Sequence, residues 1–130
     1  MKRTIQPESI PDPRPRYSQG IIAEGKRLLF VAGQTAVDAD GNVVGKGDPG
    51  AQAEQVLKNM KSVLDEAGAD FSNIVKITTF ITDPRFRDDL NPARLKYFSA
   101  DPPTSTLVVV SGLANPEFLV EIEAIAVLPN

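Results

Sequence analysis

A single apolar stripe between residues 48 and 68 gives the clearest secondary-structure signal in the chain. Its members recur at the three- and four-residue spacings of a helix with one buried face: Val56, Leu57, Met60, Val63, Leu64 and Ala67. Asp48 and Pro49 are typical of a helix N-cap and first turn, and Gly68 is typical of the position after a helix end. The pattern therefore predicts one long amphipathic helix packed against a core.

Strand-like runs precede this helix. Residues rich in apolar and β-branched types predict strands at Tyr17–Ala23 and Arg27–Ala32, and Glu24-Gly25 between them favours a hairpin-like turn. Gln34–Val37 is expected to continue the second strand past Gly33. The first two strands are therefore predicted to be neighbours.

Two further segments before the helix carry turn and breaker residues. Asp38–Gly41 predicts a turn, and Asn42–Val44 predicts a short returning strand. Pro7–Pro15 contains four prolines, which lack a backbone donor and fix φ. We expect that N-terminal stretch to be extended and irregular.

The second half of the chain alternates strands and one short helix. Ile74–Ile81 is rich in β-branched residues and predicts a strand, which Thr82-Asp83-Pro84 should end. A shorter helix is expected to begin near Asp88–Asn91 and to run through Tyr97-Phe98. Strands are predicted at Ser105–Val110 and Val120–Val127.

This order of elements indicates an α+β fold: a two-layer sandwich in which a mixed β-sheet packs on two helices. No repeat or linker divides residues 1–130, so we expect a single domain. Leu107–Val110 is apolar on both faces, although helices can cover only one face of such a sheet. Either scattered apolar residues remain exposed or another subunit covers them, and we favour subunit packing.

The amino-acid composition limits the kinds of catalytic and metal-binding groups that the chain can use. The 130 residues include no cysteine and no histidine, which excludes thiolate nucleophiles, the Ser-His-Asp relay and the commonest metal ligands. Catalysis would have to use carboxylates, hydroxyls, basic side chains or backbone groups.

Charge and hydropathy indicate where the protein acts. The net charge of −3 disfavours nucleic acid as a partner. Apolar runs are far shorter than the roughly 20 residues of a membrane span, and no signal-peptide core begins the chain. We expect a cytoplasmic protein with no membrane association.

Several motifs in a fixed order carry a resemblance to a known family. They are Tyr17-Ser-Gln-Gly20, Leu29-Phe-Val-Ala-Gly-Gln34, Gln55-Val-Leu-Lys-Asn59, Val63-Leu64, Ala67-Gly-Ala69, Val75-Lys-Ile-Thr-Thr-Phe-Ile81, the helix at Asn91, Tyr97-Phe98 and Glu121-Ile-Glu-Ala-Ile-Ala126. Together they cover nearly the whole chain. The sequence resembles the YjgF/RidA (reactive intermediate deaminase) family.

The resemblance implies a chorismate-mutase-like α+β fold assembled as a homotrimer, with small-molecule clefts at the subunit boundaries. Its best-known members hydrolyse enamines or imines, such as 2-aminoacrylate, to a keto acid and ammonia. It also implies that neither a metal nor a cofactor is needed, which suits a chain without histidine or cysteine.

The resemblance also implies a set of site residues. A glutamate matching Glu121 positions the attacking water, and residues matching Tyr17, Gly33 and Asn91 line the cleft. Backbone groups at Thr106 and Leu107 would contact the reacting amine or water.

Taken alone, each of these residues has an ordinary structural explanation. Glu121 and Glu123 alternate with apolar residues and could mark a solvated strand face, and Tyr17 could be an amphipathic interface residue. Asn91 could be an N-cap before a proline, and Gly33 could only relieve the strand backbone. The family resemblance favours the functional interpretation of Glu121.

The chain departs from the family pattern at one position. Deaminating members carry an arginine after a Pro-Ala pair, where it holds the substrate carboxylate, and this chain has Ser105 there. A serine hydroxyl cannot reproduce a planar bidentate guanidinium. Arg16 or Arg94, which lies three residues after Asn91 on the same helix face, could compensate, or both could be solvated surface residues.

Three functions remain open at the level of sequence. The first is a hydrolase or deaminase of a small enamine, imine or related metabolite, in which Glu121 positions water. The second is a non-catalytic small-molecule-binding trimer that has lost deaminase activity. The third, the endoribonuclease activity sometimes attached to the family, is disfavoured by the acidic charge balance.

Overall fold

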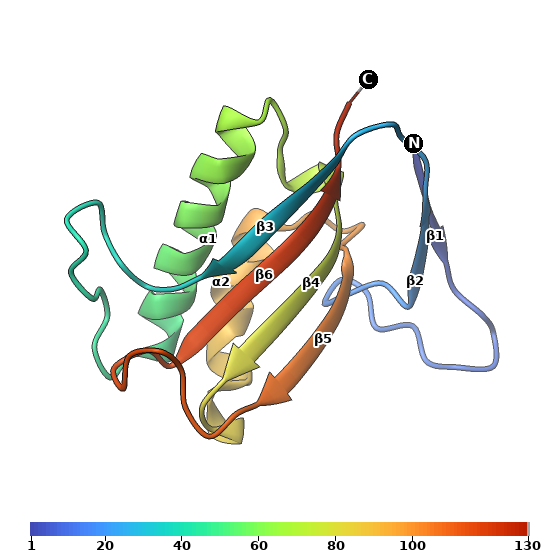
Figure 1. Ribbon diagram of the computed structural model, residues 1–130. Helices are drawn as coiled ribbons and strands as arrows, with labels where there is room; N and C mark the ends of the chain where they lie inside the picture. The colour runs from blue at the N-terminus through green and yellow to red at the C-terminus, as the bar shows by residue number, and fades with distance from the viewer. Residues whose placement is uncertain (130) are drawn as a thin grey trace.

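The computed structural model describes residues 1–129 and shows one layer of helices against one face of a sheet (Figure 1). The elements are β1 (Lys2–Ile5), β2 (Gly20–Ala23), β3 (Leu28–Gln34), α1 (Pro49–Glu66), η1 (Phe71–Asn73), β4 (Ile74–Ile81), η2 (Pro84–Phe86), η3 (Asp88–Leu90), α2 (Asn91–Tyr97), β5 (Thr104–Val109) and β6 (Val120–Val127). The predicted two-layer α+β fold is confirmed.

The main sheet has four strands in the order β3-β6-β4-β5. β6 pairs antiparallel with both β3 and β4, whereas β4 and β5 are parallel, so the sheet is mixed as predicted. β5 is an edge strand, and the helix α2 that precedes it lies behind the sheet beside α1 (Figure 1).

The long helix has the predicted ends. Asp48 Oδ1 accepts a hydrogen bond from the Ala51 backbone N–H at 3.1 Å, and Pro49 occupies the first turn. The helix ends at Glu66, and Gly68 follows with a left-handed φ of +73°. The apolar stripe of α1 is buried against the inner face of the sheet, at Val56, Leu57, Met60 and Leu64.

The predicted hairpin of the two N-terminal strands is wrong. β2 pairs with β1, an N-terminal strand that the sequence pattern did not indicate, and these two form a separate two-stranded sheet. Glu24-Gly25 therefore carries the chain from one sheet to the other. The Glu24 N–H donates to the Met1 carbonyl at 2.8 Å, so the partner of this segment comes from the chain terminus.

Local predictions on either side of this crossover were partly correct. The first predicted strand starts at Gly20 rather than Tyr17. The Ser18 N–H donates to the Pro103 carbonyl oxygen at 2.9 Å, so the chain just before Gly20 pairs near β5 and not with β1. Asn42–Val44 forms only an isolated bridge between Val43 and Val37.

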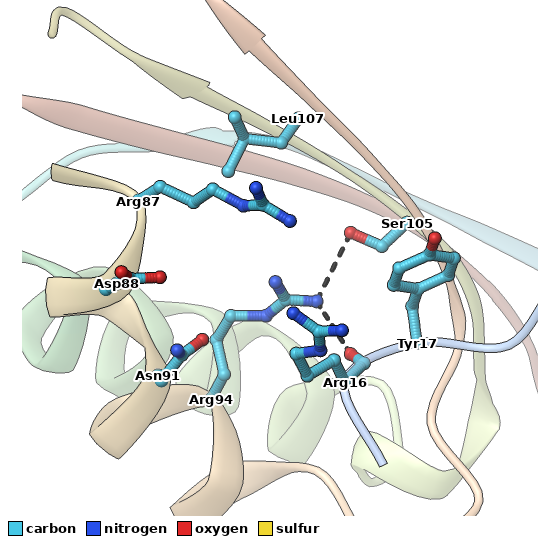
Figure 2. A pocket seen from close by; sticks show the side chains of 8 residues that line it. All are labelled: Arg16, Tyr17, Arg87, Asp88, Asn91, Arg94, Ser105 and Leu107. Atoms are coloured by element: carbon cyan, nitrogen blue, oxygen red, sulfur yellow. Dashed lines mark hydrogen bonds between the residues drawn. The ribbon is translucent and has the colours of Figure 1, made fainter. Parts of the chain in front are cut away.

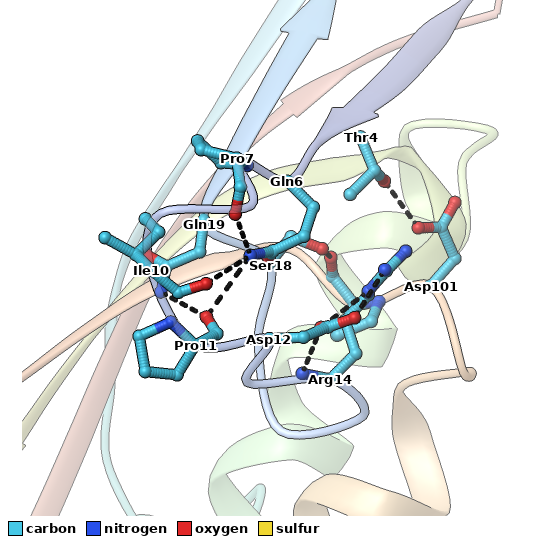
Figure 3. Close-up of polar contacts among 11 residues, drawn as sticks. Thr4, Gln6, Pro7, Ile10, Pro11, Asp12, Arg14, Ser18, Gln19 and Asp101 are labelled. Carbon is cyan, nitrogen blue, oxygen red and sulfur yellow. Dashed lines mark hydrogen bonds and ion pairs between the residues drawn. The ribbon is translucent and has the colours of Figure 1, made fainter.

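The proline-rich segment contains no strand or helix, as expected. It is folded around Gln6, whose amide Nε2 lies 3.0–3.3 Å from the carbonyl oxygens of Pro7, Ile10 and Pro11 (Figure 3). Thr4 Oγ1 in β1 donates to Asp101 at 2.6 Å, and the Ser18 N–H, just after the segment, donates to the Pro103 carbonyl oxygen at 2.9 Å. The chain on both sides of the segment is therefore tied to residues before β5. This connection brings residues near position 16 to the edge of the main sheet.

The two faces of the main sheet differ. On β4 and β6 the residues facing the helices are buried, including Ile77, Ile81, Val120 and Ile122. The opposite, open face carries apolar side chains that are exposed in one protomer: Phe30 is 69% exposed and Val108 is 37% exposed. No helix in the described residues is long and apolar enough to cross a membrane.

Candidate functional site

A cavity of about 310 Å³ lies where the edge strand β5 meets η3, α2 and the residues before β2. Figure 2 shows its lining side chains, which converge from segments far apart in the sequence. They are Arg16, Tyr17, Arg87, Asp88, Asn91, Arg94, Ser105 and Leu107. This volume is at the small end of ligand pockets and suits a small metabolite.

Six of the residues singled out from the sequence meet in this cavity. They are Arg16, Tyr17, Asn91, Arg94, Ser105 and Leu107. Strand alternation explains the two contributions of β5: Ser105 and Leu107 pair with Ile77 and Thr79, so their side chains project from the sheet face that the helices cover.

The guanidinium of Arg94 reaches the position where the sequence lacks an arginine. Its Nη2 donates to Ser105 Oγ at 3.2 Å and to the Arg16 carbonyl oxygen at 2.9 Å (Figure 2). Its Nε is buried and has no hydrogen-bond partner among the described residues. A buried N–H without an acceptor costs free energy, so the protein holds this guanidinium in place without satisfying all of its donors.

The cavity is strongly basic. Arg16, Arg87 and Arg94 line it together with one carboxylate, Asp88, and no ion pair within residues 1–129 involves any of these three arginines. Burial, followed by the nearby positive charges of Arg16 and Arg87, lowers the pKa of the Arg94 guanidinium. The site therefore holds positive charge that the protein itself leaves uncompensated.

Sequence reasoning missed Arg87 and Asp88. Arg87, Asn91 and Arg94 are spaced by four and three residues, which places them on one side of a continuous helical run. That spacing was a usable signal, but the helix was expected to start after Arg87. In the structure Arg87 caps η3 with helical dihedral angles, so the helical path extends back to it.

The remaining predicted residues lie on the open face of the sheet. Glu121 pairs with Phe80, and Phe80 pairs with Val108, so these side chains share the face away from the helices. A Cβ built at Gly33 would lie 2.1 Å from Glu121 Oε2. In this conformation the Glu121 carboxylate therefore lies directly over Gly33, where a larger residue would displace it.

Thr106 is exposed and belongs to the same open face, between Ser105 and Leu107 of the cavity. Within one protomer the sheet thus separates two groups of predicted residues. One comprises Glu121, Gly33 and Thr106 on the open face, and the other is the basic cavity on the helix side. A single chain does not bring Glu121 into the cavity.

The described residues contain no group of three or more histidine, cysteine, aspartate or glutamate side chains that could hold a metal ion. The chemistry within reach is that of guanidinium groups, one phenol, one amide and one hydroxyl in the cavity, with a carboxylate on the opposite face. This arrangement can bind anions and, where the two faces meet, activate water.

Comparisons with known proteins agree with this architecture. A RutC family protein of Pyrococcus horikoshii is 37% identical over 126 residues, covering 97% of this chain and 98% of its own. A RutC family protein of Synechocystis is 40% identical over 130 residues and covers 98% of both chains. A crystal structure from Yersinia pestis, described as a Rid-family protein of unknown function, superposes with a TM-score of 0.90 at 37% identity, covering 98% of each chain.

The family model described as Endoribonuclease L-PSP matches residues 7–128 and so takes in both the basic cavity and the open-face carboxylate. With this match and relatives of such identity and coverage, the chain belongs to the YjgF/RidA family.

Proposed function

We propose that this protein is a Rid-type hydrolase that acts on a small reactive enamine or imine. In the reaction, water adds to the imine carbon and forms a C–O bond. A proton then passes to nitrogen, the C–N bond breaks, and a carbonyl compound and ammonia leave. Family membership supports this reaction class, and the donors of the cavity supply the means to bind an anionic substrate.

The observation that carries the proposal is the bond from Arg94 to Ser105. A serine at position 105 removes the arginine expected to hold the substrate carboxylate, but Arg94 delivers a guanidinium to the same place from α2. Its two Nη atoms offer the planar fork that a carboxylate accepts. Carboxylate recognition is thereby kept although its residue has moved.

Glu121 is proposed to position the attacking water. A carboxylate can hold water and accept its proton without histidine, provided that it lies beside the reacting carbon. Gly33 leaves the space that the Glu121 side chain occupies. Thr106 and Leu107 are consecutive residues of β5, and their side chains point to opposite faces of the sheet. Backbone groups of these two residues are proposed to contact the reacting amine or water.

The cleft is proposed to be completed by subunit packing in a homotrimer. The exposed Phe30 and Val108 side chains on the open face support this assembly, since burying them would remove apolar surface from water. The open face of one copy would then carry its Glu121 to the β5 edge of the next copy. Such an assembly joins the two residue groups that one protomer separates.

The activity is tested with 2-iminopropionate, generated in place by an amino-acid oxidase acting on alanine. The wild-type protein should speed pyruvate formation above the buffer rate, and Glu121→Gln should abolish the increase. Glu123→Gln is the matched control, because Glu123 is an exposed carboxylate two residues along the same strand face. No acceleration by the wild type would rule out deamination of monocarboxylate α-imino acids.

The assembly is tested by sedimentation at several protein concentrations. The wild type should sediment as a trimer, and Phe30→Asp should give smaller species because it places a charge on the open face. Ile22→Asp is the control, since Ile22 is 43% exposed but belongs to the separate two-stranded sheet. A monomeric wild type would contradict the proposed cleft.

A non-catalytic small-molecule-binding trimer is the second candidate. The observation in its favour is Ser105 itself, because a displaced guanidinium can hold an anion without aligning its reacting carbon on water. This candidate predicts that small carboxylates raise the unfolding temperature while 2-iminopropionate hydrolysis stays at the buffer rate. The hydrolase predicts both effects together.

A further inference from the structure

Three guanidinium groups enter one small cavity from three different segments. Arg16 comes from the chain before β2, Arg87 from the start of η3, and Arg94 from α2 (Figure 2). Recognition of one carboxylate needs only one guanidinium fork. The other two arginines are therefore not explained by binding a monocarboxylate.

The charges of the lining residues can be counted. Three arginines contribute three positive charges and Asp88 contributes one negative charge, which leaves two positive charges around about 310 Å³. This lies in a chain whose overall net charge is −3, so the cavity opposes the sign of the rest of the molecule. Such a focus attracts anions and favours those with more than one charge.

The hydrogen-bonding capacity is also in excess. Arg94 uses one nitrogen on two neutral oxygens, and its buried Nε has no partner. Arg16 and Arg87 make no side-chain hydrogen bond or ion pair with the described residues that line this cavity. Several N–H groups therefore remain for a ligand with several oxygens.

We propose that this cavity selects small ligands carrying two negative charges, which Arg94 binds together with Arg16 and Arg87. The proposal deepens the function proposed above, on which it rests for the view that the cavity is the ligand site. Its chemical class is a compact dianion, whose two sources are a dicarboxylate and a phosphorylated compound. A dianion matches the two uncompensated positive charges, whereas a monoanion leaves one of them unpaired.

The test is a calorimetric titration at constant ionic strength with size-matched probes. Malonate and inorganic phosphate supply two charges at pH 8, and propionate supplies one. The wild type should bind at least one dianion about tenfold or more tightly than propionate, which corresponds to one additional charge-assisted contact. Whichever of malonate and phosphate binds more tightly identifies the source of the second charge. Equal affinities for all three probes, or no binding of any, would overturn the proposal.

Variants assign the preference to the cavity. Arg87→Met and Arg16→Met should each reduce the dianion-to-propionate ratio several-fold, because each removes one guanidinium and keeps an apolar side chain of similar length. Arg85→Met is the matched control, since Arg85 is 84% exposed and pairs with Asp83 outside the cavity. A ratio unchanged in both cavity variants would contradict the assignment, and thermal unfolding would establish that each variant is folded.

Failure of this inference and failure of the proposed hydrolase give different results. If 2-iminopropionate is hydrolysed but malonate and phosphate bind no better than propionate, the proposed hydrolase activity is supported and the proposed selection of dianions is contradicted. If dianions bind tightly but no imine is hydrolysed, the proposed selection of dianions is supported and the proposed hydrolase activity is contradicted.

Discussion

Arg94 and Lys96 lie two residues apart on the same short helix and have opposite surroundings. Lys96 Nζ pairs with Glu54 Oε1 at 2.6 Å, and the Tyr97 hydroxyl donates to the same oxygen at 2.9 Å. Arg94 is half-buried beside two other arginines and pairs with no carboxylate in the described chain. On α2, Lys96 is thus a cation paired within the protein, whereas Arg94 is a cation without a carboxylate partner in the described chain.

The effects on pKa follow this difference. The hydrogen bond to Glu54 is the main cause that raises the pKa of Lys96, whereas burial is the main cause that lowers the pKa of Arg94. A native structure retains a buried, uncompensated charge at a cost in stability. Such a cost is typical of binding sites, where the partner of the charge is the ligand.

The largest expected difference between the two sides is in ligand affinity. Arg94→Met should weaken binding of the best dianionic probe by about 10- to 100-fold, because it removes charge-assisted hydrogen bonds. Lys96→Met should change that affinity less than about twofold, since its charge is already paired with Glu54. Calorimetric titration of both variants measures these affinities. Equal losses of affinity would contradict the proposed difference between Arg94 and Lys96.

A relocation experiment sharpens the role of Arg94. In an Arg94→Ala background, adding Ser105→Arg should raise 2-iminopropionate hydrolysis by roughly tenfold over Arg94→Ala alone, because it restores one guanidinium on β5. Ser105→Arg in the wild-type background should lower stability instead, since it adds a fourth positive charge to the cavity. An Arg94→Ala chain as active as the wild type would show that Arg94 holds no substrate.

Stability should change in the opposite direction from affinity. Arg94→Met should raise the free energy of unfolding by about 1 kcal/mol, since it replaces an uncompensated, half-buried charge with an apolar side chain of similar length. Lys96→Met should lower that free energy slightly because Glu54 loses its partner. Urea unfolding measures both, and a strong destabilisation by Arg94→Met would show that its charge is structurally satisfied.

Asp88 should weaken the binding of anions in the cavity that it lines. Asp88→Asn removes the one carboxylate among the lining residues and should tighten dianion binding by about two- to fivefold. Asp89→Asn is the control, because Asp89 is the next residue of η3 and does not line the cavity. The same titrations compare the two, and the difference should shrink as salt concentration rises.

The smallest effect concerns the paired side of α2. The bond from Lys96 is the main cause that lowers the folded-state pKa of Glu54 below its ordinary value of 4.5. Glu54 therefore contributes stability above that pH, and the contribution is lost as pH falls through the lowered pKa. Thermal unfolding between pH 6 and pH 3 should show a slightly flatter acid dependence for Glu54→Gln than for the wild type.

Local patterns predicted most of the fold. The apolar stripe of α1 and the β-branched run of Ile74–Ile81 each belong to an element that buries one face. Burial of one face can be predicted from the spacing of apolar residues along the chain. The pairing of β2 with Lys2–Ile5 was not predictable in this way. Glu24-Gly25 is compatible with a hairpin, but contacts distant in the chain decide which strand β2 joins.

The site was predictable in part for the same reason. The family motifs indicated Tyr17, Asn91 and the region of Ser105, and the structure gathers all three in one cavity. Arg87 was missed because its place on the cavity wall depends on the helical turns of η3 and α2 being continuous. No local pattern reports that continuity.

The sequence by itself determined the α+β elements, the family and the absence of an arginine at position 105. Only the tertiary structure decided where the guanidinium comes from. Arg94 meets Ser105 because its side chain reaches from α2 to the edge strand β5. Arg16 joins them because its carbonyl oxygen accepts from Arg94 and because Ser18, two residues later, is hydrogen-bonded to Pro103 before β5. These are tertiary contacts, which residue spacing does not encode, and they gather scattered arginines around one basic cavity.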